Sequence, residues 1–148
     1  MRDAWQDTLI QSITNPAKLI QQLNLADQIS PCKQAVLASF RCRVPQPFVE
    51  RMQPGKADDP LLRQVLPLDD ELDIIDGYTP DPLQEHLYQP TNGVLHKYPG
   101  RVLLTLTGSC AINCRYCFRR HFPYSEHRFN ASRWRSILDY IASDNSIH

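Results

Sequence analysis

The sequence predicts an α/β fold in which a helical lead-in precedes the first strand and helix of a parallel α/β structure. Apolar residues near the start of the chain, Trp5, Leu9 and Ile13, recur with the period of an amphipathic helix. Much later, the run RVLLTLTG over residues 101–108 has the composition of a buried strand. A polar loop and a second amphipathic pattern follow this run, so strand, loop and helix come in that order.

Prolines mark where the helices of the lead-in begin. Three dipeptides place an N-capping side chain before a proline at the first helical position, where the missing N–H of proline costs nothing. They are Asn15-Pro16, Ser30-Pro31 and Asp59-Pro60. We expect three short helices between residues 4 and 44, and a further helical segment after Asp59.

Proline also divides the chain into regions. Nine of the 12 prolines lie between Pro45 and Pro99. Proline disrupts the interior of helices and of central strands, so this stretch should contain little of either. We therefore predict a helical region over 1–66, a Pro-rich extended connector over 67–100, and the start of the α/β structure over 101–148. In the last region Asn130 is expected to cap a helix that buries one face. The apolar residues of that face are Trp134, Ile137, Leu138 and Ile141.

Charge and hydropathy exclude several classes of protein. The chain has 16 Lys and Arg against 16 Asp and Glu, so it lacks the positive field of a general nucleic-acid or anionic-membrane binder. No segment approaches the roughly 18 apolar residues of a membrane helix, and the N-terminus does not resemble a signal peptide. Five cysteines, three of them close together, fit a reducing compartment. We expect a cytoplasmic protein.

Three cysteines, Cys110, Cys114 and Cys117, follow the expected strand within eight residues. Thiolates are soft ligands for zinc or iron–sulfur clusters, and this spacing lets one loop wrap one metal centre. Three ligands leave one position of a four-iron cluster open. Two alternatives remain: a structural zinc site that adds His121 as a fourth ligand, and thiols without a metal, in a non-catalytic helical interaction module.

The pattern Cys-x3-Cys-x-Tyr-Cys after a first strand resembles the radical S-adenosylmethionine (SAM) superfamily. That resemblance implies a [4Fe-4S] cluster on the three cysteines, with SAM bound to the fourth iron. It also implies an electron donor that reduces the cluster, cleavage of SAM to a 5′-deoxyadenosyl radical, and a partial (β/α) barrel. The position of the cysteines at the end of a strand agrees with where barrel enzymes place catalytic loops.

A stretch of sequence longer than the cysteine motif indicates one family within this superfamily. Residues 81–124, DPLQEHLYQPTNGVLHKYPGRVLLTLTGSCAINCRYCFRRHFPY, resemble the lysine 2,3-aminomutase family. Upstream, FRCRVPQPFVERMQPGKADDPLLRQVLP over 40–67 resembles its EpmB-type bacterial branch, which makes (R)-β-lysine for the modification of elongation factor P. Another radical SAM aminomutase is the alternative within the superfamily.

The family resemblance implies roles for individual residues. Arg115 and Lys97 match basic positions that contact the phosphate of pyridoxal phosphate (PLP), and Arg119 matches the arginine that holds the carboxylate of the substrate, L-lysine. Tyr116 would lie near the adenine of SAM. The cluster ligands would be Cys110, Cys114 and Cys117.

The implied reaction is the 1,2-amino shift of an isomerase, which converts L-lysine to (R)-β-lysine on PLP. A complete barrel takes about 250 residues, and residues 101–148 hold only one strand, the cysteine loop and one helix. We therefore expect an N-terminal fragment that is inactive alone and contains no catalytic residue. We also expect its single strand to lack a partner.

Overall fold

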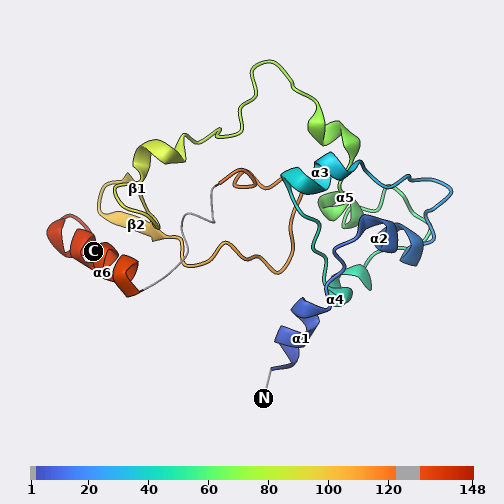
Figure 1. Cartoon of the computed structure of the whole chain (residues 1–148), viewed down its shortest axis with the longest axis horizontal. Helices are drawn as coiled ribbons and strands as arrows, with labels where there is room; N and C mark the ends of the chain where they lie inside the picture. The colour runs from blue at the N-terminus through green and yellow to red at the C-terminus, as the bar shows by residue number, and fades with distance from the viewer. Residues whose placement is uncertain (1–2, 123–130) are drawn as a thin grey trace. The chain divides into compact units, whose positions relative to one another are not determined.

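The computed structural model describes residues 3–122 and 131–148. The chain forms two compact units (Figure 1). The first contains the residues up to Tyr78 together with Cys110–Arg120, and the second contains Thr79–Ser109 together with the residues from His121 onward. The cysteine loop thus belongs to the helical first unit, although the chain enters it from the second.

Short helices build the first unit, as the sequence predicts. The elements are α1 (Ala4–Ile10), α2 (Pro16–Gln22), α3 (Gln34–Ser39), α4 (Gln46–Val49), α5 (Leu62–Val65) and the 3-10 helix η1 (Asp69–Leu72). The three helices expected between residues 4 and 44 are confirmed by α1, α2 and α3.

Two of the expected helix starts have different outcomes. Asn15 caps α2, because its Oδ1 accepts the Ala17 N–H at 3.0 Å. The start predicted at Ser30-Pro31 is wrong, since α3 begins only at Gln34. The reason is a long-range contact: the Lys33 N–H donates to Asp69 Oδ1 of η1 at 2.7 Å, and this carboxylate takes the place of a local cap.

The core of the first unit forms between elements that are far apart in sequence. An antiparallel bridge joins Ile13 to Val44, with N–H to O distances of 2.8 and 2.9 Å in the two directions. Around it lie fully buried aliphatic side chains from α2 and α5 and the segments next to them. These are Leu19, Leu25, Val44, Leu62 and Val65. The cysteine loop contributes the partly buried Ile112 to the same cluster.

The second unit consists of a hairpin and one long helix. Its elements are the 3-10 helix η2 (Glu85–Tyr88), β1 (Val94–Tyr98), β2 (Arg101–Leu104) and α6 (Ala131–Ser143). β1 and β2 pair in antiparallel fashion, with Val94 opposite Leu104 and Tyr98 opposite Arg101. The mixed helix and strand content agrees with the predicted α/β class, while the described residues contain this antiparallel pair and no parallel one.

The strand expected over 101–108 needs three corrections. It ends at Leu104, it is only half-buried, with Leu103 46% exposed, and it has a partner. The partner was missed because β1 lies inside the Pro-rich stretch that predicted an extended connector. Pro99-Gly100 connects the two strands, and Gly100 has a φ of +79°, which glycine adopts without strain.

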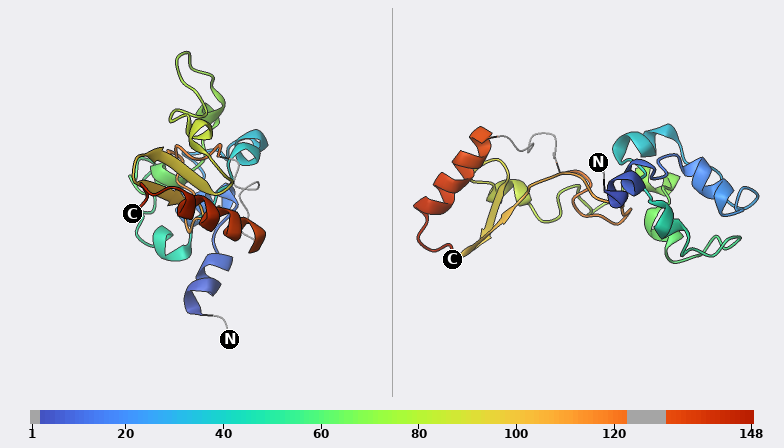
Figure 2. Two further views of the ribbon diagram at one scale, coloured as in Figure 1. Left: turned by 90° about the vertical axis from the view of Figure 1, so that its left-hand side faces the viewer. Right: turned by 90° about the horizontal axis from the view of Figure 1, so that it is seen from below.

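Helix α6 packs on one face of the hairpin (Figure 2). Ile137 is fully buried and approaches Gly93, while the His96 Nδ1 lies 2.6 Å from the Tyr140 hydroxyl. The predicted apolar face is only partly a core, because Trp134 is 41% and Leu138 is 45% exposed. The predicted cap, Asn130, lies outside the described residues.

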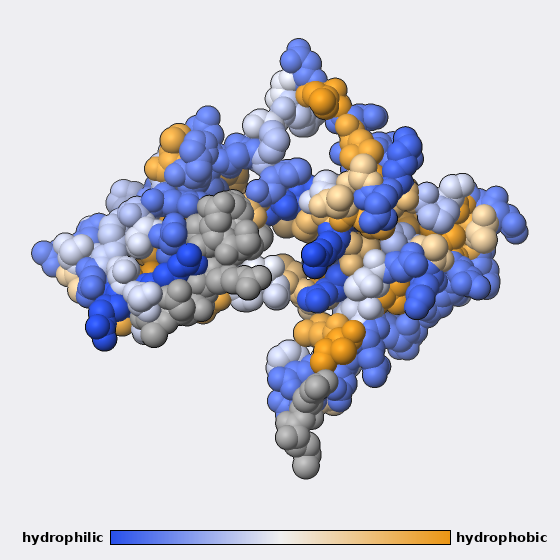
Figure 3. Space-filling model, viewed as in Figure 1, coloured by the Kyte–Doolittle hydropathy of each residue, from blue (hydrophilic) through white to orange (hydrophobic). Residues whose placement is uncertain are grey.

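Several apolar side chains lie on the surface of the first unit (Figure 3). Trp5 and Ile10 of α1 are 61% and 65% exposed, and Ile74, in the segment after η1, is fully exposed. Among the described residues, no helix has both the length and the apolar character needed to cross a membrane.

Asp59 provides a test of the lead-in. Its Oδ1 accepts the N–H groups of Leu61 and Leu62 at 2.9 and 3.0 Å, and its Oδ2 accepts the Gln53 N–H at 3.1 Å. Asp59→Ala leaves these donors unpaired at a buried position, so we expect the free energy of unfolding to fall by about 2 kcal/mol. Denaturant unfolding followed by circular dichroism measures this loss. The control, Asp58→Ala at an exposed position, should change it by less than about 0.5 kcal/mol.

Gly100 provides a test of the hairpin. A Cβ at this position would lie 2.9 Å from His148 Cε1 and 3.2 Å from the Ser146 carbonyl oxygen, in addition to the positive φ. We expect Gly100→Ala to destabilise the hairpin by about 2 kcal/mol. The measurement is faster hydrogen exchange of the Thr105 amide, which donates to the Gly93 carbonyl next to β1 at 2.8 Å. Gly77→Ala, which has a φ of +83° and open space around the added carbon, should leave the exchange of that amide unchanged.

Candidate metal centre in the cysteine loop

The cysteine loop, residues 110–120, is attached to the first unit by residues that lie between the cysteines. The Asn113 N–H donates to the Arg43 carbonyl at 3.1 Å, and the Asn113 side-chain amide donates to the Arg41 carbonyl at 2.9 Å. Ile112 packs on the apolar core. Figure 1 shows the loop, in orange, beside α3. An irregular segment is thus fixed without strands or helices of its own.

Arg115 attaches the loop through both its backbone N–H and its guanidinium. Its N–H donates to the Gln64 carbonyl at 2.7 Å. Its guanidinium donates twice to the Glu71 carboxylate, from Nε at 2.8 Å and from Nη2 at 2.5 Å, and also from Nη1 to the Phe40 carbonyl at 3.0 Å. The side chain is only 7% exposed. Arg115 is therefore a buried cation with a two-pronged carboxylate partner.

Glu71 receives a second guanidinium. Arg120 Nη2 lies 2.7 Å from Glu71 Oε2, and the Leu68 N–H donates to Oε1 at 3.1 Å. Burial opposes ionisation of this carboxyl, but the hydrogen bonds from Arg115, Leu68 and Arg120 outweigh it and hold the pKa of Glu71 below its usual range. Both guanidinium groups also lie against the Phe40 ring, 4.9 and 5.1 Å from its centroid.

The three thiols of the loop remain accessible. Cys110 is exposed, Cys114 and Cys117 are half-buried, and all are free. Free thiols in one loop have the donor chemistry that an iron–sulfur cluster requires. In the described part of the chain, no three Cys, His, Asp or Glu side chains are gathered into a group that could hold a metal ion. The loop therefore contains thiols of the kind that bind an iron–sulfur cluster. That these three thiols come together around one metal centre stays a prediction.

Tyr116 lies on the outer side of the loop. It is 71% exposed, and its hydroxyl donates to Gln64 Oε1 at 3.4 Å. The neighbouring Cys114 thiol holds the pKa of Tyr116 above its ordinary value, because a nearby thiolate disfavours a second negative charge. An exposed aromatic ring beside a thiol is available to stack on a planar ligand.

The other predicted site residues lie in different surroundings. Arg119 lies against the Phe118 ring, with its Cζ 5.0 Å from the centroid. Lys97 belongs to the second unit, where its Nζ donates to the Leu83 carbonyl at 3.0 Å and lies 5.1 Å from the centroid of the Tyr88 ring. His121, the fourth ligand of the zinc alternative, is exposed.

Sequence reasoning missed Glu71 and Phe40. Glu71 lies in an acidic run, DDELD, that looks like a solvated surface, and Arg115 is 44 residues further along the chain. No local pattern links the two. The one feature of the sequence that could have indicated this pairing is the opposite charge of the Arg-rich loop and the distant acidic run.

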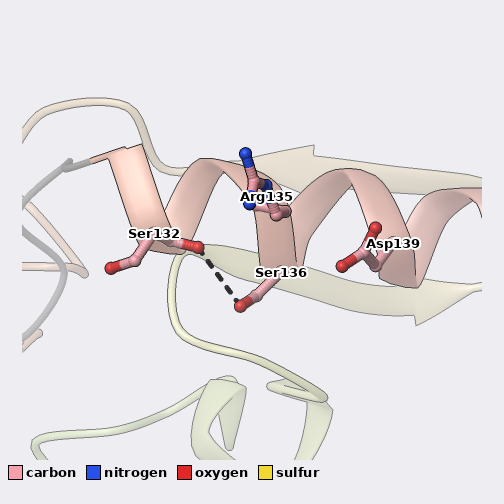
Figure 4. Close-up of a pocket in the computed structure, with 4 residues that line it drawn as sticks. All are labelled: Ser132, Arg135, Ser136 and Asp139. Atoms are coloured by element: carbon pink, nitrogen blue, oxygen red, sulfur yellow. Dashed lines mark hydrogen bonds between the residues drawn. The ribbon is translucent and has the colours of Figure 1, made fainter.

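Helix α6 carries a separate open depression of about 380 Å³. It is lined by four residues of that helix, which Figure 4 shows along one face: Ser132, Arg135, Ser136 and Asp139. The Ser136 hydroxyl donates to the Ser132 carbonyl at 3.3 Å. None of the predicted site residues lines it.

The chain resembles curated proteins of known class, although no family model matches it. L-lysine 2,3-aminomutase of Escherichia coli (strain K12) is 44% identical over 96% of the chain, and that of Haemophilus influenzae is 41% identical over 97%. That of Buchnera aphidicola is 40% identical over 99%. The chain spans 42 to 44% of the length of these relatives.

The name of these relatives describes enzymes that move an amino group within lysine. By this similarity, which extends over almost all of its residues, the chain resembles part of the lysine 2,3-aminomutase family. The resemblance to this family inferred from residues 81–124 is therefore confirmed.

The five thiols should differ in reactivity. Cys42 is buried, and burial raises its pKa to about 11, so at pH 8 about one molecule in a thousand carries its thiolate. We expect iodoacetamide to modify the exposed Cys110 fastest and Cys42 at least 100-fold more slowly, as measured by mass spectrometry of the metal-free chain. Equal rates for Cys42 and Cys110 in the folded protein would contradict this arrangement.

Proposed function

We propose that the chain is the cluster-binding part of a radical SAM, PLP-dependent L-lysine 2,3-aminomutase. The observation that carries the proposal is the set of three free, accessible thiols at Cys-x3-Cys-x2-Cys spacing, on a loop held by the residues between them. The names of the relatives support the substrate and the reaction class. The product would be (R)-β-lysine, destined for elongation factor P.

Cys110, Cys114 and Cys117 would hold a [4Fe-4S] cluster. A bound cluster would supply the single electron for the cleavage of SAM, and its open iron would be the position for SAM. Tyr116, exposed beside Cys114, would contact the adenine with its flat ring. The electron itself would come from a separate electron donor.

Arg119 is the proposed partner of the lysine carboxylate, because a guanidinium offers two parallel donors. Lys97 is proposed for the PLP phosphate. Arg115, the other residue proposed for that phosphate, does not fit it in this structure, because its guanidinium is already bound by Glu71 and by the carbonyl of Phe40.

The remaining parts of the proposal concern the whole protein. β2, the cysteine loop and α6 would form the opening of a partial (β/α) barrel whose other strands contribute the rest of the active site. The region boundaries at residues 66 and 100 stay predictions, as does a cytoplasmic location. By itself, the chain is expected to be inactive.

Anaerobic reconstitution with iron and sulfide tests the cluster. We expect a brown, oxygen-sensitive protein with about four iron atoms per chain, and loss of the visible absorbance on Cys→Ala substitution at 110, 114 or 117. The matched control is Cys32→Ala, a half-buried thiol outside the loop, which should keep the full iron content. Absorbance, electron paramagnetic resonance and metal analysis are the measurements.

Other results of the same experiment support other functions. A colourless protein with one zinc per chain, reduced by His121→Ala, would support the structural zinc module. A chain that binds no metal, and folds unchanged without its cysteines, would be a helical interaction module. Either result would overturn the proposal.

A further inference from the structure

We propose that Glu71 is a positioning residue that holds the cysteine loop on the helical unit through Arg115 and Arg120. These three side chains are called the latch below. All three are largely buried, with exposed fractions of 14% for Glu71, 7% for Arg115 and 14% for Arg120. The inference builds on the proposed function, because the loop is the proposed cluster site, yet it can be tested without metal.

The balance of charge makes Glu71 central. Two guanidinium groups lie against one Phe40 ring, about 5 Å from its centroid, and guanidinium does not lose its proton in proteins. Glu71 is the carboxylate that bonds to both. Buried charges need partners, so removing this negative charge leaves two buried cations close to each other.

The hydrogen bonds use both oxygens of the carboxylate. Oε1 accepts from Arg115 Nε and from the Leu68 N–H, while Oε2 accepts from Nη2 of Arg115 and of Arg120. Glutamine has nearly the same shape, but its amide nitrogen only donates. Glu71→Gln therefore breaks the contacts at one end of the side chain while preserving its volume.

The two arginines fix the turn that carries two of the thiols. The Cys117 N–H donates to the Cys114 carbonyl at 3.1 Å, and the Arg120 N–H donates to the Cys117 carbonyl at 3.1 Å. Along the chain, Arg115 precedes Cys117 and Arg120 follows it. A carboxylate that holds both arginines restrains the position of Cys117 between them.

The Arg115 amide is the reporter for the test, because it donates to the Gln64 carbonyl at 2.7 Å and so joins the loop to the end of α5. In the metal-free chain, we expect Glu71→Gln to speed hydrogen exchange of this amide by about 10- to 100-fold, measured by NMR. The Leu25 amide of the helical core should keep its rate. The matched control is Asp70→Asn, an exposed neighbour, which should change neither rate.

A second variant separates positioning by charge from simple packing. In Glu71→Gln/Arg120→Gln only one guanidinium remains beside Phe40, so the repulsion between two cations is gone. We expect this double variant to recover part of the lost protection, with an exchange rate at the Arg115 amide at least threefold slower than in Glu71→Gln. A contact that acted only through packing would show no such recovery.

Two results would overturn the latch: an unchanged exchange rate for the Arg115 amide in Glu71→Gln, or a double variant that is no slower than the single one. Iron content after reconstitution is measured separately on the unsubstituted chain. A latch that behaves as expected in a chain that binds no iron would therefore contradict the proposed function alone.

Discussion

The pairing of Glu71 with Arg115 is the interaction on which the described cysteine loop most depends. The loop has no strand or helix of its own, so it must be fixed by side chains and by isolated backbone hydrogen bonds. A buried guanidinium that donates to a carboxylate and to the Phe40 carbonyl, next to its own backbone bond to Gln64, provides several such restraints at one residue. The same carboxylate then holds Arg120.

Within this short loop, the residues that attach it to the helical unit differ from the thiols proposed to bind metal. Ile112, Asn113 and Arg115 lie between the cysteines and make the contacts with the helical unit. The thiols at 110, 114 and 117 are free and at least partly accessible. The separation is physically reasonable, because a thiol buried in an apolar core resists ionisation, as the raised pKa of Cys42 illustrates. A metal-binding thiol must lose its proton.

The sequence predicted the features that depend on neighbouring residues. Asn15-Pro16 begins a helix because the cap and the proline act within one turn. Sequence-based prediction was wrong where a residue far along the chain determines the structure. The Asp69 carboxylate accepts the Lys33 N–H, and α3 begins later than predicted. Strand β1 pairs with β2 although prolines surround it. The cysteine spacing indicated a metal site, but no local pattern could show that Glu71 lies against the loop.

Arg115 shows how the two kinds of information combine. The family resemblance implies that Arg115, between the second and third cysteines, contacts a phosphate, whereas its partner in the structure is the Glu71 carboxylate. Phosphate and carboxylate are both anions that suit the fork of a guanidinium, and in the described fold the anion beside Arg115 is the Glu71 carboxylate. Glu71 and Arg115 both belong to the first unit, so this pairing forms within the helical lead-in and its loop. A phosphate could reach Arg115 only by displacing Glu71, and the second cation, Arg120, would then need a new partner or share the incoming one.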